Sequence, residues 1–60
     1  MQRYEIVFYR NGILDELIPF KKMHKEFNSY QEAKVWAQNE LYDLPTAVAM
    51  NVFIDYGYLR

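Results

Sequence analysis

The sequence predicts an α+β fold of the β-β-α-β type, in which one helix packs on one face of a three-stranded sheet. Three observations predict it: apolar and polar residues alternate over residues 2–9, a capped helix signal covers residues 29–43, and a second alternating run covers residues 47–56. A further strand is expected over residues 13–22. With 60 residues, the chain is expected to form one domain, 1–60.

The helix expected over residues 29–43 begins at a capping box. The Ser29 hydroxyl can accept a hydrogen bond from the backbone N–H of Glu32, and the Glu32 carboxylate can reach back to the N–H of Ser29. Pro45 disfavours helical geometry at the residue before it, so the helix is expected to end near Asp43. The apolar stripe that should face the sheet consists of Tyr30, Ala33, Ala37, Leu41 and Leu44.

The two N-terminal strands are expected to form a hairpin at Asn11-Gly12, because both residues tolerate positive φ. A two-residue turn would place Asp15 and Leu17 on the core face of the sheet. A three-residue loop with Gly12 at the bulge position would place a more apolar set there. We favour the second register, because register follows the buried face. The core face of the first strand holds Tyr4, Ile6 and Phe8, and the favoured partners are Leu14, Glu16, Ile18 and Phe20.

The last strand, over residues 47–56, is the longest apolar strand. A right-handed crossover over the helix would place it beside the first strand, which gives the sheet order 2-1-3 with all strands antiparallel. Parallel pairing of the second and third strands is the alternative. The face expected toward the helix holds Val48, Met50, Val52, Ile54 and Tyr56.

Composition argues against several classes of protein. The net charge of −1 gives no global electrostatic case for nucleic-acid binding. No apolar run approaches the ~20 residues that span a membrane, and the N-terminus lacks the apolar segment of a signal peptide. With no cysteine and one histidine, a metal site is not expected. The absence of cysteine fits a reducing compartment, so a cytoplasmic location is expected.

No catalytic constellation is found. His24 is the one conventional general base near neutral pH, and no nucleophile is paired with it in the sequence pattern. Only two glycines occur, so no phosphate-binding loop is recognised. We therefore expect a non-enzymatic protein without a cofactor.

Two apolar surfaces remain once the fold is assembled. On the helix, Val35 and Tyr42 lie opposite the apolar stripe and Trp36 lies on its flank. Trp36 either closes the edge of the core or joins the other two in a partner-binding patch. The uncovered sheet face offers a second partner-binding set: Tyr9, Leu17 and Phe53. One surface is expected to serve a homodimer and the other a target protein.

Lys21, Lys22 and Lys25 form the one basic cluster. They are interpreted either as a solvated strand end or as contacts for phosphate or an acidic partner. The second interpretation makes a nucleic-acid-binding accessory domain an alternative function.

The run Phe27-Asn28-Ser29-Tyr30-Gln31-Glu32-Ala33-Lys34-Val35-Trp36-Ala37 resembles a pattern common in small bacteriophage accessory proteins. That pattern has an aromatic residue, a serine cap, a Glu-Ala pair and an aromatic-Ala pair. The opening strand with Asn11-Gly12 is similar in style. The resemblance implies a host-takeover or anti-defence protein that binds a host enzyme or an anti-phage complex such as CRISPR. The expected function is a non-catalytic inhibitor that blocks its target sterically. A nucleic-acid-binding domain and a purely structural oligomerising subunit are the alternatives.

Overall fold

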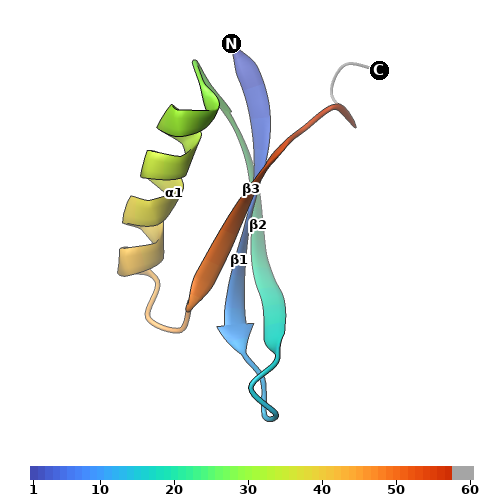
Figure 1. The fold of residues 1–60 in the computed structure, drawn as a ribbon, viewed down its shortest axis with the longest axis vertical. Coiled ribbons are helices and arrows are strands. Elements are labelled where there is room, and N and C mark those ends of the chain that lie inside the picture. Colours follow the sequence, from blue (N-terminus) through green and yellow to red (C-terminus); the bar gives the residue numbers. More distant parts are fainter. Residues whose placement is uncertain (58–60) are drawn as a thin grey trace.

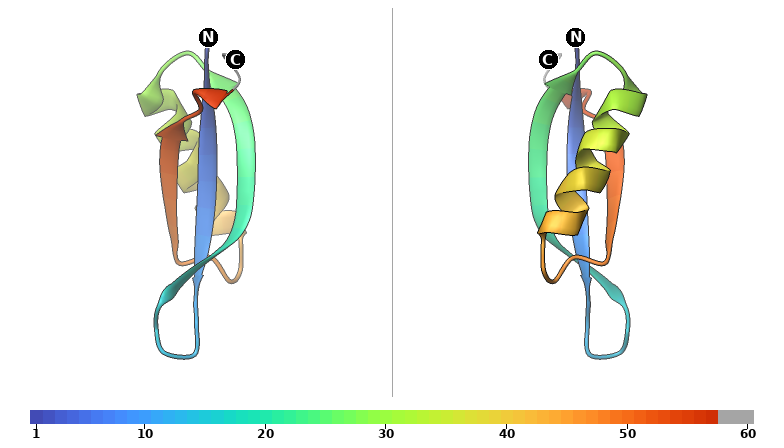
Figure 2. Two further views of the ribbon diagram at one scale, coloured as in Figure 1. Left: turned by 90° about the vertical axis from the view of Figure 1, so that its right-hand side faces the viewer. Right: turned by 90° about the vertical axis from the view of Figure 1, so that its left-hand side faces the viewer.

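The computed structural model describes residues 1–57. In this part of the chain the elements follow in the order β1 (Gln2–Asn11), β2 (Leu17–Phe27), α1 (Tyr30–Asp43) and β3 (Ala49–Ile54). The sheet order is β2-β1-β3 and both pairs are antiparallel, with α1 on one face (Figures 1 and 2). The predicted α+β fold and strand order are confirmed, and the alternative of parallel pairing between the second and third strands is wrong.

The core lies between β1 and α1. Across the sheet, Met50 and Val52 of β3 lie opposite Phe8 and Ile6 of β1, so their side chains point to the same face as the helix. The predicted alternation of these strands is therefore confirmed. Almost no solvent reaches the central cluster, which consists of Tyr4, Ile6, Phe8, Phe27, Ala33 and Ala37.

The ends of α1 follow the sequence prediction. Ser29 is the N-cap in extended backbone geometry, and its hydroxyl accepts a hydrogen bond from the N–H of Glu32 at 3.1 Å. At the other end the Leu44 N–H donates to the Leu41 carbonyl at 3.3 Å, directly before Pro45. Within the predicted stripe, Tyr30 at the first helical position is 46% exposed, so this end of the helix is only partly packed.

The hairpin differs from both predicted registers. Strand β2 was expected over residues 13–22, but it begins at Leu17 and continues to Phe27, which leaves a five-residue loop, 12–16. The positive φ falls on Asp15, at 64°, and neither Asn11 nor Gly12 adopts one. The register is set by residues far from the turn. Met23 and Phe27 supply the apolar side chains of β2 beneath the helix, and their burial determines which residues of β1 and β2 pair.

A β-bulge links the two halves of β2. Pro19 lies opposite Tyr9 and Lys21 opposite Phe8, which leaves Phe20 as the extra residue. Because of the extra residue, the side chains of β2 before the bulge alternate out of step with those after it. As a result Pro19 points to the open face with Tyr9, whereas Lys21 points to the helix face with Phe8.

Strand β3 is shorter than the predicted 47–56 strand. Its flanks are still tied to β1, because the Val48 N–H donates to the Tyr9 carbonyl and the Asp55 N–H to the Arg3 carbonyl, both at 2.9 Å. Tyr56, which was expected in the strand, lies beyond it and is exposed. Residues 58–60 of the predicted domain lie outside the described part of the chain. Within residues 1–57 no helix has the length and apolar character to cross a membrane.

The N-cap gives the first testable prediction. Ser29→Ala should lower the free energy of unfolding by about 1 kcal/mol, because the N–H of Glu32 loses its acceptor. Ser29→Asp should retain most of the stability, since a carboxylate accepts the same hydrogen bond. Urea titration followed by circular dichroism measures both variants. Equal losses in the two would contradict the role of the cap.

Candidate protein-interaction site

Trp36 is fixed at the border of the core. Its ring packs against that of Phe27, with ring centroids 5.7 Å apart and planes tilted by 50°. The Lys25 ammonium lies 4.8 Å from the centroid of the Trp36 ring, within the range of a cation–π contact. Trp36 is half-buried, so it closes the edge of the core and still presents part of its ring to solvent. The interpretation that Trp36 closes the edge of the core is confirmed, whereas its role in partner binding stays a prediction.

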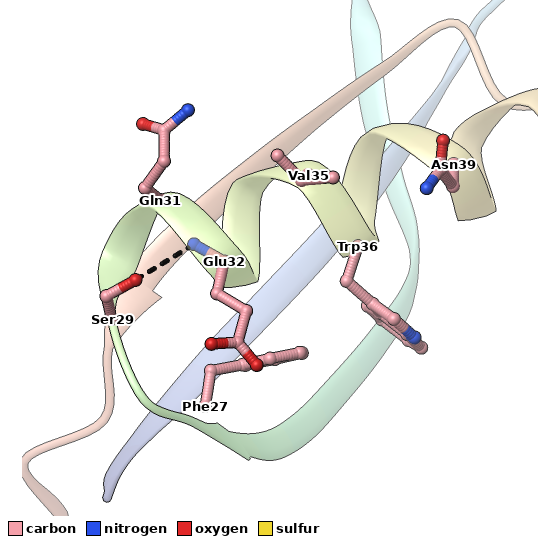
Figure 3. Close-up of a pocket in the computed structure, with 7 residues that line it drawn as sticks. All are labelled: Phe27, Ser29, Gln31, Glu32, Val35, Trp36 and Asn39. Atoms are coloured by element: carbon pink, nitrogen blue, oxygen red, sulfur yellow. Dashed lines mark hydrogen bonds between the residues drawn. The ribbon is translucent and has the colours of Figure 1, made fainter.

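A groove of about 510 Å³ lies beside Trp36. Figure 3 shows Trp36 and Glu32 extending from α1 toward Phe27, whereas Gln31 points away from Phe27. Val35, 53% exposed, borders this groove and also a second hollow of about 200 Å³ along the helix. The larger groove is lined by apolar and polar side chains together: Phe27, Ser29, Gln31, Glu32, Val35, Trp36 and Asn39.

Tyr42 does not line either of these hollows. It is 77% exposed near the end of α1, and its hydroxyl lies 3.5 Å from the Gln38 side-chain nitrogen. The structure therefore brings Val35 and Trp36 together in one groove and leaves Tyr42 outside it. We call the groove with its lining residues the Trp36 groove.

The open sheet face separates its three predicted site residues. Leu17 lies opposite Asn11 near the hairpin, while Phe53 lies opposite Glu5. Tyr9 is four residues from Glu5 along β1, a distance of roughly 13 Å in a strand. Val7 between them is only 6% exposed. The three aromatic and aliphatic side chains share a face but do not form one contact surface.

Ion pairs occupy much of the same face. Lys22 Nζ lies 3.2 Å from Glu5 Oε1, and Arg3 Nε lies 3.4 Å from Asp55 Oδ2. His24 Nε2 lies 3.8 Å from the same Asp55 oxygen. None of these pairs was predicted from the sequence, and His24 lay outside the strand expected over residues 13–22. They make this face more polar than the sequence indicated.

The lysine cluster is divided between the two faces of β2. Lys22 lies opposite Val7 on the open face, whereas Lys21 and Lys25 lie opposite Phe8 and Tyr4 on the helix face. The three ammonium groups therefore do not form one anion-binding patch. Among residues 1–57, no group of three or more His, Cys, Asp or Glu side chains is placed to hold a metal ion.

The hairpin loop is a surface that the sequence analysis missed. Ile13 and Leu14 are 101% and 84% exposed. The loop extends beyond the end of the helix (Figure 1). Both residues were expected inside a strand. They are exposed because the loop, 12–16, is longer than predicted and includes them. The five-residue loop also forms a shallow hollow with Arg10 and Ile18.

Comparison of this chain with protein-family models, with curated proteins and with solved structures gave no match. The function is therefore argued from these surfaces.

The contact between Lys25 and Trp36 gives the second prediction. Lys25→Met keeps an unbranched side chain but removes the charge above the ring, so it should lower the free energy of unfolding by about 0.5–1 kcal/mol. Lys21→Met is the matched control, because Lys21 lies on the same strand and the same face. Fluorescence of Trp36, the one tryptophan of the chain, follows unfolding in urea. Equal effects of the two substitutions would show that the Trp36 ring gains nothing from Lys25.

Proposed function

We propose that this chain is a small non-catalytic interaction module, a phage-encoded inhibitor that binds a host protein or an anti-phage defence protein, such as a CRISPR complex, and blocks it sterically. The Trp36 groove is the observation that carries the proposal. The resemblance of residues 27–37 to small phage accessory proteins supplies the biological context, and the same residues line most of the groove.

The groove has the features of a protein-binding surface. Tryptophan and other aromatic residues contribute a large share of binding energy when they are seated in a well-packed setting. Trp36 is already held by Phe27 and Lys25, so little side-chain freedom is lost when a partner docks. Gln31 and Asn39, which also line the groove, offer amide donors and acceptors, and these favour a polypeptide partner with its own backbone groups.

Steric blocking requires only a stable complex on the correct surface of the target. A domain of this size can cover part of a partner without any catalytic group. The nucleic-acid alternative is less well supported, because Lys22 pairs with Glu5 and Lys25 lies over Trp36. The net charge of −1 argues in the same direction.

The third prediction concerns Val35. Val35→Asp should weaken target binding by about 2 kcal/mol, roughly thirtyfold in dissociation constant, because a carboxylate would be desolvated at the groove without a partner. Leu17→Asp is the matched control on the open sheet face, since Leu17 is 56% and Val35 is 53% exposed. Tagged wild-type and variant chains would be used for capture from bacterial lysate, in parallel with and without nuclease treatment. The captured protein, once purified, would be titrated with each chain while its own activity is measured.

The expected outcome is a stoichiometric complex that inhibits the captured protein, that Val35→Asp weakens and that Leu17→Asp leaves intact. The reverse pattern would assign target binding to the open sheet face and overturn the role of the groove. Capture of nucleic acid alone, lost after Lys21→Glu, Lys22→Glu and Lys25→Glu together, would replace the inhibitor with the nucleic-acid function.

A further inference from the structure

The two edges of the sheet differ in how they are protected from pairing with another strand. Unprotected sheet edges tend to pair with a further strand, and natural edges are usually guarded by proline, by lysine or by a bulge. Strand β2 has all three devices: Pro19, the bulge at Phe20, and three lysines among its eleven residues. This edge is therefore unsuited to strand addition.

Strand β3 has none of these devices. Its sequence, Ala-Met-Asn-Val-Phe-Ile, has no charge and no proline, and its register with β1 is regular over the whole strand. Within the described residues β1 is its one strand neighbour, so its outer edge is unpaired. The strand is also rich in residues that favour β-structure. This edge is suited to accept another strand.

The backbone geometry shows which groups are available there. The Asp55 N–H donates to the Arg3 carbonyl of β1. Because hydrogen bonds to a neighbour alternate along an antiparallel strand, the N–H groups of Met50, Val52 and Ile54 point away from β1. They form a row of donors along the free edge, interleaved with the carbonyl groups of the same residues.

Apolar side chains are exposed along the same edge. Val48, Phe53 and Ile54 are 50%, 47% and 42% exposed. Ile54 is exposed although its side chain points to the face of the sheet that carries α1. Strand addition would bury apolar surface on both faces of the sheet.

We infer that β3 pairs antiparallel with β3 of a second copy of this chain, which joins the two sheets into one of six strands. With a twofold axis at Val52, Met50 would lie opposite Ile54 of the second copy and Asn51 opposite Phe53. Both sets of outward N–H groups would then find carbonyl partners. The pairing is isologous, so each chain offers the same surface to the other.

Charge favours a second copy at β3 and disfavours one at β2. Isologous pairing places a strand against itself, and like charges directly opposite one another are destabilising. The six residues of β3 are uncharged. The same operation on β2 around Met23 would place Lys21 opposite Lys25 and Lys22 opposite His24. A second β3 is also already ordered by its own β1, whereas a disordered segment of another protein would lose backbone freedom on pairing.

The dimer would leave the Trp36 groove accessible. Trp36 contacts Lys25 and Phe27 of β2, at the edge of the sheet opposite to β3. This arrangement differs from the homodimer through the open sheet face that the sequence suggested. Pairing through β3 does not depend on the identity of any target.

The fourth prediction is the mass of the pure chain in solution. Light scattering during size-exclusion chromatography should give twice the chain mass of 7.3 kDa. Phe53→Lys adds a charge to the β3 edge and should return the mass to that of one chain. Leu17→Lys is the matched control, because Leu17 is similarly exposed but lies on β2, and it should leave the dimer intact. Circular dichroism of both variants checks that they are folded.

Hydrogen exchange on the unmodified chain tests the same edge without substitution. The amides of Met50, Val52 and Ile54 should exchange more slowly as concentration increases. A single-chain mass at all concentrations, or a dimer in which these amides exchange freely, would overturn the inference. Protection of these amides by a bound target, with the pure chain remaining a monomer, would assign the edge to a foreign strand. A dimer that survives Phe53→Lys but not Leu17→Lys would place the interface elsewhere.

Discussion

The close approach of α1 to β1 is the constraint on which the rest of the structure depends. Ala33 and Ala37 are fully buried, and their small side chains let the helix backbone lie near the sheet. The space between is filled by Tyr4, Ile6 and Phe8 of the central strand. A domain of this size buries only about 60% of the surface of its unfolded chain, so the loss of one such contact affects the whole core. The single helix covers a single face, and every other surface follows from that arrangement.

The uncovered parts of the sheet are stabilised in different ways. On the open face, Glu5 pairs with Lys22 and Asp55 with Arg3, and Val7 is buried between neighbouring strands. These ion pairs are partly exposed, and each contributes at most about 1 kcal/mol. Their main effect is to make the face polar. Apolar side chains remain exposed in the Trp36 groove, in the hairpin loop and along the β3 edge.

Local sequence signals predicted the elements whose structure is locally determined. The Ser29 cap, the helix end before Pro45 and the alternation of β1 and β3 required only neighbouring residues, and the strand order followed from them. The hairpin register did not, because it depends on which residues of β2 lie beneath the helix. The segment 21–27 is mostly charged, so Met23 and Phe27 were not recognised as core residues of a strand. Val35 and Trp36 were selected from helical periodicity, which depends on neighbouring residues alone. The packing of Phe27 and Lys25 against Trp36 could not be predicted in this way, because it depends on the course of β2.

Trp36 packs on β2 at one edge of the sheet, whereas the free edge belongs to β3 at the other. The groove lies beside the end of β2 that carries Lys25 and Phe27, on the strand that is protected from pairing with a further strand. Self-pairing at β3 would place two grooves at the two ends of a continuous sheet. Two sites on one rigid body can engage a target that presents two copies of its surface, and the second contact then forms at a high effective concentration. Under the proposed function, two grooves on one dimer would therefore bind a repeated or oligomeric target more tightly than either groove alone.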